Sequence, residues 1–485
     1  MPKITIVGAG GYAFPLGMSR DVLSFPALQD STICLYDIDA SRVRRTAKGV
    51  RGMVDMFKLP AKVQVTTEPE KAFKDADFCI CTFQVGGIEA YGHDVNIPRK
   101  YGIDQCVGDT FGPGGIFRGL RSIKALSEIA GYMHRLCPKA VFIQYANPMA
   151  MNSWAMSRLG INNVGLCHSV QGTSMMLARE MDLPYDECSF ISAGINHQAW
   201  FTDFRCNGID VMPLLRKTML EKHLAGKDKG GASDEFFAGG GERVRTEIMR
   251  LTGYFQTESS AHASEYMAYF RKNAEMVQDY QPNRWDYYEI CCNHAESTQV
   301  KDFLANIKKQ GLKQSHEYGA SIINSIVSGQ VSLIHGSVPN RNIITNLPNE
   351  CSVEVPVFVD REGLRPQVIG DLPPACAAVN RVSLNEVQLA VEAALTGDRD
   401  LVYAAVAHDP LTSALLTLPQ IRAMVDQMIS AQKRWLPELK SKTLVTAGAD
   451  AIAKTVRASL ENKSAQPKPS RAKKATAKKR KAAKK

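Results

Sequence analysis

Short apolar runs and longer amphipathic stretches alternate over the first 195 residues and predict parallel strands separated by helices. Helical spacing covers 116–136, and Asp39 is placed to cap a helix that runs through Phe57. Buried strands are predicted at 3–7, 32–37, 62–66, 77–83 and 139–145. Because such alternation is typical of a doubly wound parallel sheet, we predict an α/β fold with a Rossmann-like N-terminal domain.

The pattern changes after residue 195, where we expect a C-terminal α/β domain. A strand is predicted at 198–207, followed by helices at 212–224, 383–394 and 419–434. The segment 226–241 is rich in glycine and charge, which predicts a mobile loop near a site or a surface insert. The expected domains are therefore 1–195 and 196–462, followed by a tail at 463–485.

Composition narrows the class of protein. The 485 residues are 45% hydrophobic and 22% charged, as in ordinary globular proteins. No apolar run reaches 18 residues, so no membrane span is expected. The chain enters its first strand at once, and its twelve cysteines show no disulfide or zinc-knuckle spacing. These features predict a cytoplasmic protein without a signal peptide.

The formal charge of +10 resides in the tail. Residues 463–485 hold 11 Lys and Arg and no acid, which leaves 48 basic and 49 acidic residues in the remainder. The tail lacks the apolar residues needed to fold alone. It is expected to be either a solvated extension or a segment that binds an acidic partner such as nucleic acid.

A glycine-rich turn follows the first predicted strand. Gly8, Ala9, Gly10 and Gly11 lead into a helix, and Ala13 completes a G-x-G-x-x-A pattern. Such a turn lets a pyrophosphate approach the helix N-terminus. Asp37 ends the second strand, where a carboxylate accepts hydrogen bonds from ribose hydroxyls and repels a 2′-phosphate. NAD is therefore the predicted cofactor, and an ordinary structural turn is the alternative.

Several further residues with potential chemistry stand at predicted strand ends. Cys167 and His197 are 30 residues apart and can supply a thiolate and an imidazole to one divalent ion, with positions left for substrate and water. This ligand pair suits Mn, Fe, Co or Ni better than Ca, with Zn left open. Asn147 follows a buried strand and can bind a substrate hydroxyl. Asp109 begins a glycine-rich loop that is either a binding loop or a simple turn.

Seven motifs together resemble glycoside hydrolase family 4, whose members are NAD- and divalent-metal-dependent glycosidases with a fold like lactate and malate dehydrogenases. The resemblance covers roughly 3–460 and excludes the tail. In chain order, the motifs are VGAGGYAFP, LYDID, DTFGPGGIFRGLR, YANPMAMNSWA, GLCHSVQGT, AGINHQAWF and SEYMAYFRK. Within the family, His168-Ser169-Val170 resembles the α-galactosidase branch, whereas 6-phosphoglycosidases commonly carry Asp or Asn after the Cys.

The resemblance implies a mechanism of oxidation and elimination. NAD⁺ takes hydride from sugar C3, a base removes the C2 proton, the C1–O bond breaks, water adds and the retained NADH reduces C3. Cys167 and His197 then hold the metal, for which Mn is favoured, and Tyr266 matches the base. The leaving group is expected to be protonated by His168, with Asp109 as the second candidate. The alternative role for His168 is to orient the site only. Family members also suggest a dimer or tetramer.

The segment 86–96 contains no Lys or Arg, and Tyr91 stands where a cation for a sugar phosphate would be expected, so an unphosphorylated substrate is favoured.

Three alternatives stay open. Activities on α-glucosides, α-glucuronides or α-galacturonides are near neighbours within the family. A 2-hydroxy-acid dehydrogenase on the same fold predicts net NADH production, and a nucleic-acid-binding protein would depend on residues 463–485.

Overall fold

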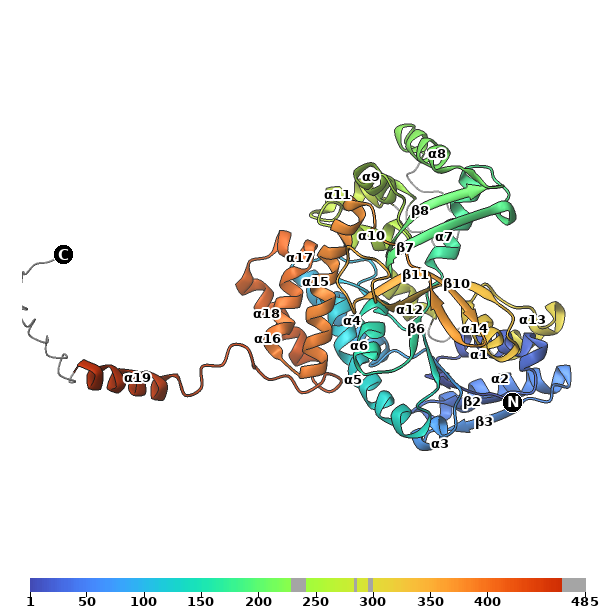
Figure 1. Ribbon diagram of the computed structural model, residues 1–485, viewed down its shortest axis with the longest axis horizontal. Helices are drawn as coiled ribbons and strands as arrows, with labels where there is room; N and C mark the ends of the chain where they lie inside the picture. Colours follow the sequence, from blue (N-terminus) through green and yellow to red (C-terminus); the bar gives the residue numbers. More distant parts are fainter. Residues whose placement is uncertain (228–240, 283–285, 295–299, 465–485) are drawn as a thin grey trace, which may run out of the picture. The chain divides into compact units, whose positions relative to one another are not determined.

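The structure is a computed structural model, and it describes residues 1–227, 241–282, 286–294 and 300–464 (Figure 1). Contacts within the chain define one compact unit at 1–440 and a second at 441–485. The boundary expected at residue 195 falls at the last residue of a strand inside the first unit. The division into 1–195 and 196–462 stays a prediction.

A six-stranded parallel sheet forms the first half of the larger unit. Its strand order is β3-β2-β1-β4-β5-β6, and neighbouring strands in this part pair in parallel. The central strands are buried apolar runs, which suits a sheet covered on both faces. The predicted Rossmann-like sheet is confirmed. Its strands are β1 Lys3–Val7, β2 Thr32–Tyr36, β3 Lys62–Thr66, β4 Phe78–Cys81, β5 Val141–Gln144 and β6 Asn163–Gly165.

Helices connect these strands, and their ends follow local chemistry. The Asp39 side chain accepts hydrogen bonds from Ser41 N at 2.8 Å and Arg42 N at 3.1 Å, which caps α2 as predicted. Helix α5 starts at Gly112, four residues before the predicted start, because the glycine-rich loop itself enters the helix. The helices are α1 Ala13–Ser24, α2 Ala40–Phe57, α3 Pro69–Phe73, α4 Gly87–Lys100, α5 Gly112–Leu136 and α6 Met149–Arg158.

The sheet continues beyond β6 with antiparallel strands. Ser337 of β10 pairs with Gly165 of β6, and Glu354 of β11 pairs with both Ser337 and Gly194 of β7. One row of four residues therefore joins the two halves of the sheet. The strands are β7 Cys188–Ile195, β8 Gln198–Cys206, β9 Ile209–Asp210, β10 Ser332–Pro339, β11 Ser352–Asp360 and β12 Gly363–Pro366.

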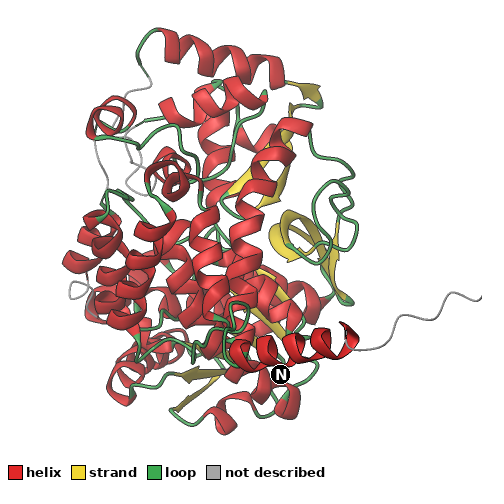
Figure 2. Cartoon of the chain, turned by 90° about the vertical axis from the view of Figure 1, so that its left-hand side faces the viewer, coloured by secondary structure: helices red, strands yellow, loops and turns green. Residues whose placement is uncertain are grey.

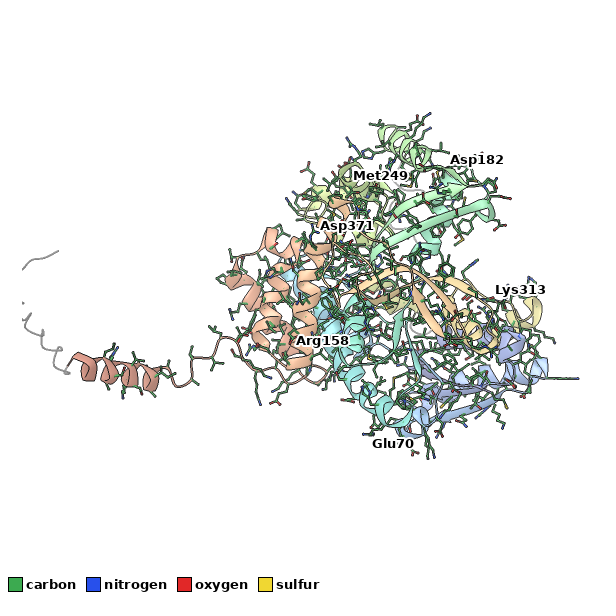
Figure 3. All side chains as sticks on the ribbon, in the orientation of Figure 1. Glu70, Arg158, Asp182, Met249, Lys313 and Asp371 are labelled. Carbon is green, nitrogen blue, oxygen red and sulfur yellow. The ribbon has the colours of Figure 1, made fainter. Side chains whose placement is uncertain are left out.

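Helices also cover the second half, and α15 packs against α5 and α16. Figure 2 shows helices packed around the strands. The side chains that fill these layers are drawn in Figure 3, where Glu70 marks the region of α3 and Asp182 lies just after α7. The remaining helices of this unit are α7 Ser169–Glu180, α8 Met212–Leu224, α9 Arg243–Thr252, α10 Ser260–Glu265, α11 Ala274–Tyr280, α12 Tyr287–His294, α13 Val300–Gln310, α14 Tyr318–Ser328, α15 Pro374–Thr396, α16 Arg399–His408, α17 Pro410–Leu415 and α18 Leu418–Gln432.

The second unit contains α19, Ala449–Ser464. Its apolar side chains Ile452, Val456 and Leu460 are exposed. Most of the predicted loop at 226–241 and of the predicted tail at 463–485 lies outside the described residues. None of the described helices combines the length with the apolar character that a membrane crossing requires.

A carboxyl group lies at the centre of the row that joins the two halves of the sheet. Glu354 is fully buried, and its Oε1 accepts a hydrogen bond of 3.2 Å from Asn196 Nδ2. Burial raises the pKa of Glu354 from 4.5 to about 7, an effect that the Asn196 hydrogen bond and the charge of His197 only partly offset. The carboxyl group is therefore neutral in mildly acidic solution.

Glu354→Gln should flatten the pH dependence of stability. Because the pKa of Glu354 is higher in the folded state, its stabilising contribution is complete below pH 4.5 and is lost as the pH rises through about 7. The loss amounts to about 3 kcal/mol, which an uncharged amide does not suffer. Urea unfolding between about pH 5 and pH 8 measures it. The exposed Glu362→Gln is the control, and an unchanged slope in Glu354→Gln would contradict the assignment.

Candidate functional site

The glycine-rich turn after β1 packs tightly against its neighbours on one side and is open on the other. Gly8 has φ +85°, and a Cβ there would lie 2.7 Å from the Phe83 Cβ. A Cβ on Gly10 would lie 2.7 Å from Asp37 Oδ2, which accepts a 2.8 Å hydrogen bond from Gly10 N. At Gly11 a Cβ would meet only Pro15, at 3.9 Å. The turn and Asp37 are thus adjacent, and the backbone at Gly11 is accessible to a ligand.

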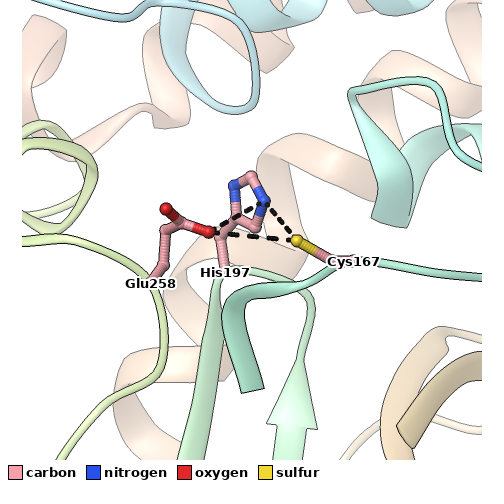
Figure 4. A group of neighbouring side chains, drawn as sticks. All are labelled: Cys167, His197 and Glu258. Atoms are coloured by element: carbon pink, nitrogen blue, oxygen red, sulfur yellow. Dashed lines mark hydrogen bonds and ion pairs between the residues drawn. The ribbon is translucent and has the colours of Figure 1, made fainter. Parts of the chain in front are cut away.

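Cys167 and His197 meet although they come from different halves of the sheet. Cys167 follows β6, and His197 lies in the turn between β7 and β8 with φ +68°. Their Sγ and Nε2 atoms are 3.4 Å apart (Figure 4). Ligand atoms about 2.0–2.3 Å from one ion lie roughly 3.0–3.6 Å from each other, so this pair fits a shared divalent ion.

Glu258 is a third member of this cluster, and the sequence prediction missed it. Its ligand oxygen, with Cys167 Sγ and a His197 nitrogen, forms a group whose atoms all lie within 4.8 Å of one another. The available signal was weak: an acidic residue beside the Ser259 helix cap, eight positions before Tyr266. Only the fold shows that this segment reaches the end of β6.

The orientation of the His197 ring is fixed by its second nitrogen. Nδ1 lies 3.0 Å from Thr110 Oγ1 and 3.1 Å from the Tyr266 hydroxyl, and the side chain is only 2% exposed. Nε2 is therefore the atom that faces Cys167. The structure thus brings the predicted base, Tyr266, into contact with the predicted metal ligand.

The ionisation of the cluster is set by burial and by neighbouring charges. Burial raises the pKa of Cys167 to about 12. Burial also raises the pKa of Glu258, but the charges of His262, His197 and His168 outweigh it and lower that pKa to about 2. For Tyr266, burial and the charges of surrounding carboxylates raise the pKa well above 10. The thiol and the phenol therefore need a nearby positive charge to ionise near neutral pH.

Asp109 and Asn147 also come together as a pair. Asn147 Nδ2 donates a 3.1 Å hydrogen bond to Asp109 Oδ2, and Arg118 Nη1 lies 3.7 Å from the same oxygen. Thr110 Oγ1 donates to Asp109 Oδ1 at 2.8 Å. Burial raises the pKa of Asp109, but Arg118 and two histidines hold it below its usual range. Asp109 is therefore a buried, ionised hydrogen-bond acceptor.

His168 has different surroundings from the other predicted site residues. Its side chain is 40% exposed, and its Nδ1 lies 3.4 Å from Glu317 Oε1. Burial opposes protonation, but the Glu317 hydrogen bond and the neighbouring negative charges raise the pKa of His168 to about 9. Its ring is therefore protonated at neutral pH and reaches solvent beside Cys167.

The loop that carries Asp109 is held by one buried carboxylate. Glu265 Oε1 accepts a hydrogen bond from Val107 N at 2.6 Å, and Oε2 accepts one from Gly108 N at 2.9 Å. Gln105 Nε2 donates to the same Oε2 at 3.4 Å. Glu265 directly precedes Tyr266 in the chain. The same short segment therefore positions the tyrosine and holds the loop that carries Asp109.

Comparison with known proteins gives a consistent result along the chain. The model of "Family 4 glycosyl hydrolase" matches residues 3–183, and that of its C-terminal domain matches 192–412. An α-galactosidase of Rhizobium meliloti (strain 1021) is 36% identical over 90% of this chain and 89% of its own length. An α-galactosidase of Bacillus subtilis (strain 168) is 35% identical over 91% and 100%, respectively.

Solved structures share the fold at lower identity. A 6-phospho-α-glucosidase from gut microorganisms, in complex with NAD and Mn²⁺, has a TM-score of 0.72 and is 21% identical over 90% of this chain and 100% of its own. The 6-phospho-β-glucosidase of Thermotoga maritima, solved with manganese, NAD⁺ and glucose-6-phosphate, has a TM-score of 0.70 at 17% identity. It covers 91% of this chain and 100% of its own. These similarities establish the fold.

Glu265→Ala should destabilise the protein and free the Asp109 loop. Two buried backbone N–H groups lose a charged acceptor, which should cost about 2–4 kcal/mol in the free energy of unfolding. Urea titration measures the loss, and hydrogen exchange at Val107 and Gly108 localises it. Glu68→Ala is the control, because the exposed Glu68–Lys71 pair contributes under about 1 kcal/mol. Unchanged exchange at both amides would contradict the role of Glu265.

Proposed function

The chain belongs to family 4 of the glycosyl hydrolases, and from that premise we propose that it hydrolyses α-galactosides with NAD and a divalent metal ion. The observation that carries the proposal is the meeting of Cys167 Sγ and His197 Nε2 at 3.4 Å, with the Tyr266 hydroxyl at the other nitrogen of the same ring. The α-galactosidases of R. meliloti and B. subtilis, which span nine-tenths of the chain, support the choice of sugar.

NAD is proposed to bind at the turn formed by Gly8, Ala9, Gly10 and Gly11. The open backbone at Gly11 fits a pyrophosphate, and Asp37 at the end of β2 fits the adenosine ribose. Both carboxylate oxygens of Asp37 already accept backbone N–H groups, which fixes their position and leaves lone pairs for hydroxyls. The two solved 6-phosphoglucosidases were crystallised with NAD, which supports this cofactor.

The divalent ion is proposed to be Mn²⁺, held by Cys167 and His197. Both solved relatives contain manganese, and the thiol and imidazole leave positions for sugar oxygens. The chemistry supplied by these groups when bound is reversible hydride transfer at sugar C3 and polarisation of the neighbouring oxygens. The residues around them determine the rest of the reaction.

Tyr266 is proposed to remove the proton from sugar C2 with its hydroxyl oxygen. The 3.1 Å contact of this oxygen with Nδ1 of His197, the proposed metal ligand, supports the role. The positive charge that its ionisation requires would lie on the other side of the same ring. Asn147 is proposed to bind a sugar hydroxyl, because its amide still has hydrogen-bonding capacity after donating to Asp109.

His168 is proposed to protonate the leaving group. It lies beside Cys167 with a partly exposed ring, and Glu317 holds it in place. Asp109 suits this role less well, because Asn147, Thr110 and Arg118 surround its two oxygens with donors and a positive charge. Asp109 is therefore proposed to position Asn147 and the sugar.

The substrate is proposed to be unphosphorylated and uncharged. Tyr91 is buried, and its hydroxyl donates to Val107 O, so this position of α4 offers no cation for a sugar phosphate. Arg118 is already paired with Asp109, which disfavours the carboxylate of a uronic acid. α-Glucosides, which differ in C4 stereochemistry, are the second candidate, and a curated relative from Erwinia rhapontici, 28% identical, is an α-glucosidase.

The protein is further proposed to act in the cytoplasm as a dimer or tetramer. All twelve cysteines are free thiols, as suits a reducing compartment. The cross-strand partners Leu333 and Phe358, with nearby Val331, form an exposed apolar patch that a second copy would cover. The basic tail at 463–485 is proposed to contact an acidic partner outside the catalytic unit.

The proposed reaction predicts hydrolysis of p-nitrophenyl α-galactoside that requires both NAD⁺ and Mn²⁺ under reducing conditions. NAD⁺ should be needed only in catalytic amounts, because the hydride returns to the sugar. The α-glucoside, α-glucuronide and 6-phosphorylated analogues should react at least about tenfold more slowly. Stoichiometric NADH formation from a 2-hydroxy acid, without glycoside hydrolysis, would instead identify a dehydrogenase.

Tyr266→Phe should lower kcat by about 10²- to 10⁴-fold, because the phenylalanine cannot take the C2 proton. Mn²⁺ and NAD⁺ affinities should stay close to those of the wild type. In D₂O the wild-type product should carry deuterium at C2. Tyr403→Phe, which removes the hydroxyl that contacts Asp426, is the control and should leave turnover unchanged. Full activity in Tyr266→Phe would assign the base elsewhere.

A further inference from the structure

Glu258 brings a negatively charged side chain to Cys167 and His197. Its Oε2 lies 3.4 Å from His197 Nε2 and 3.9 Å from Cys167 Sγ (Figure 4). The Glu258 side chain is 7% exposed. Placing a carboxylate in such a position is costly unless another group compensates its charge.

The two oxygens of Glu258 have separate environments. Oε1 accepts a 3.1 Å hydrogen bond from Ser259 N and lies 3.2 Å from His262 Nδ1. These contacts hold the carboxylate in one orientation and direct Oε2 toward the thiol and the imidazole. A carboxylate with one oxygen anchored and the other directed at two metal-binding atoms is arranged as a monodentate metal ligand.

The backbone of Glu258 and of His197 is also strained in this arrangement. Glu258 has φ +69° and His197 has φ +68°, a left-handed conformation that costs energy for residues other than glycine. Neighbouring contacts hold both residues in place: Gln256 Nε2 donates a 3.0 Å hydrogen bond to His197 O, and Thr257 N donates one of 2.8 Å to Ala199 O. Two strained residues thus direct their side chains to one point.

We propose that Glu258 is a third protein ligand of the divalent ion, so that Sγ of Cys167, Nε2 of His197 and Oε2 of Glu258 hold it together. Ligand atoms of one ion lie roughly 3.0–3.6 Å apart. Two separations here, both 3.4 Å, fall within this range, and the third, 3.9 Å, is slightly wider. The inference rests on the proposed metal-dependent function and extends its ligand set.

The charge of the site supports three ligands. A thiolate and a carboxylate together carry two negative charges, which balance a divalent cation in a buried position. With a neutral imidazole as third ligand, an ion that takes six ligands keeps about three positions for sugar oxygens and water. The alternative is that Glu258 transfers a proton or orients His262 without contacting the ion.

A direct measurement of Mn²⁺ affinity distinguishes a metal-ligand role of Glu258 from a role in proton transfer or in orienting His262. Mn²⁺ is titrated into the metal-free full-length protein, without sugar or NAD⁺, and free Mn²⁺ is followed by electron paramagnetic resonance. Glu258→Gln keeps the shape of the side chain but loses its charge, and its Kd should rise at least about tenfold. Glu258→Asp, which keeps the charge on a shorter stem, should give an intermediate Kd. Asp409→Asn, which alters another buried carboxyl group, the N-cap of α17, should change Kd by less than about twofold.

Cobalt supplies a second readout. In the Co²⁺-loaded protein, Glu258→Gln should retain the thiolate-to-cobalt absorption of Cys167 but shift the ligand-field bands, because one oxygen ligand changes. Circular dichroism and thermal unfolding establish that each variant is folded. If Glu258→Gln misfolds, the Glu258→Asp titration and its cobalt spectrum decide.

The outcomes distinguish this inference from the function on which it rests. A Mn²⁺ Kd in folded Glu258→Gln equal to that of the wild type, with unshifted cobalt bands, overturns the ligand role. Wild-type protein that binds no Mn²⁺ overturns both the ligand role and the proposed metal dependence. Wild-type protein that binds Mn²⁺ but hydrolyses no α-galactoside overturns the proposed substrate and leaves Glu258 as a ligand.

Discussion

The site depends on a single row of backbone pairing that joins the parallel and antiparallel halves of the sheet. Gly165 pairs with Ser337, Ser337 with Glu354, and Glu354 with Gly194. A Cβ on Gly165 would lie 2.4 Å from Ser153 Oγ, and a Cβ on Gly194 would lie 2.5 Å from Gln198 O. Both junctions thus require glycine. The segments that carry Cys167 and His197 leave the sheet just beyond these glycines.

The buried polar groups of the site form a series of contacts in which each group orients the next. Glu265 fixes the loop that carries Thr110, whose hydroxyl contacts His197 Nδ1, so Nε2 of the same ring faces Cys167. His262 anchors one oxygen of Glu258. Because a buried polar group without a partner is costly, these contacts keep the cluster in one arrangement. Such preorganisation serves a reaction that must move hydride and proton at adjacent carbons.

Local sequence patterns predicted the parallel half well. The bounds of β1 and β3 and the cap at Asp39 agree with the structure, because buried runs and capping residues act over a few positions. The antiparallel strands β10, β11 and β12 were not predicted. Their register depends on pairing with segments far away in the chain, which short-range periodicity does not report.

The sequence by itself determined the family, the glycine turn with Asp37, and the identities of Cys167 and His197 as candidate ligands, since motif spacing and residue chemistry are local properties. The tertiary structure decided which residues meet. It brought Glu258 to the cluster, set Tyr266 against His197 and buried Asp109 beside Asn147. Residues distant in sequence come within hydrogen-bonding distance only when the complete sheet and its covering helices form, so one local pattern could not predict that proximity.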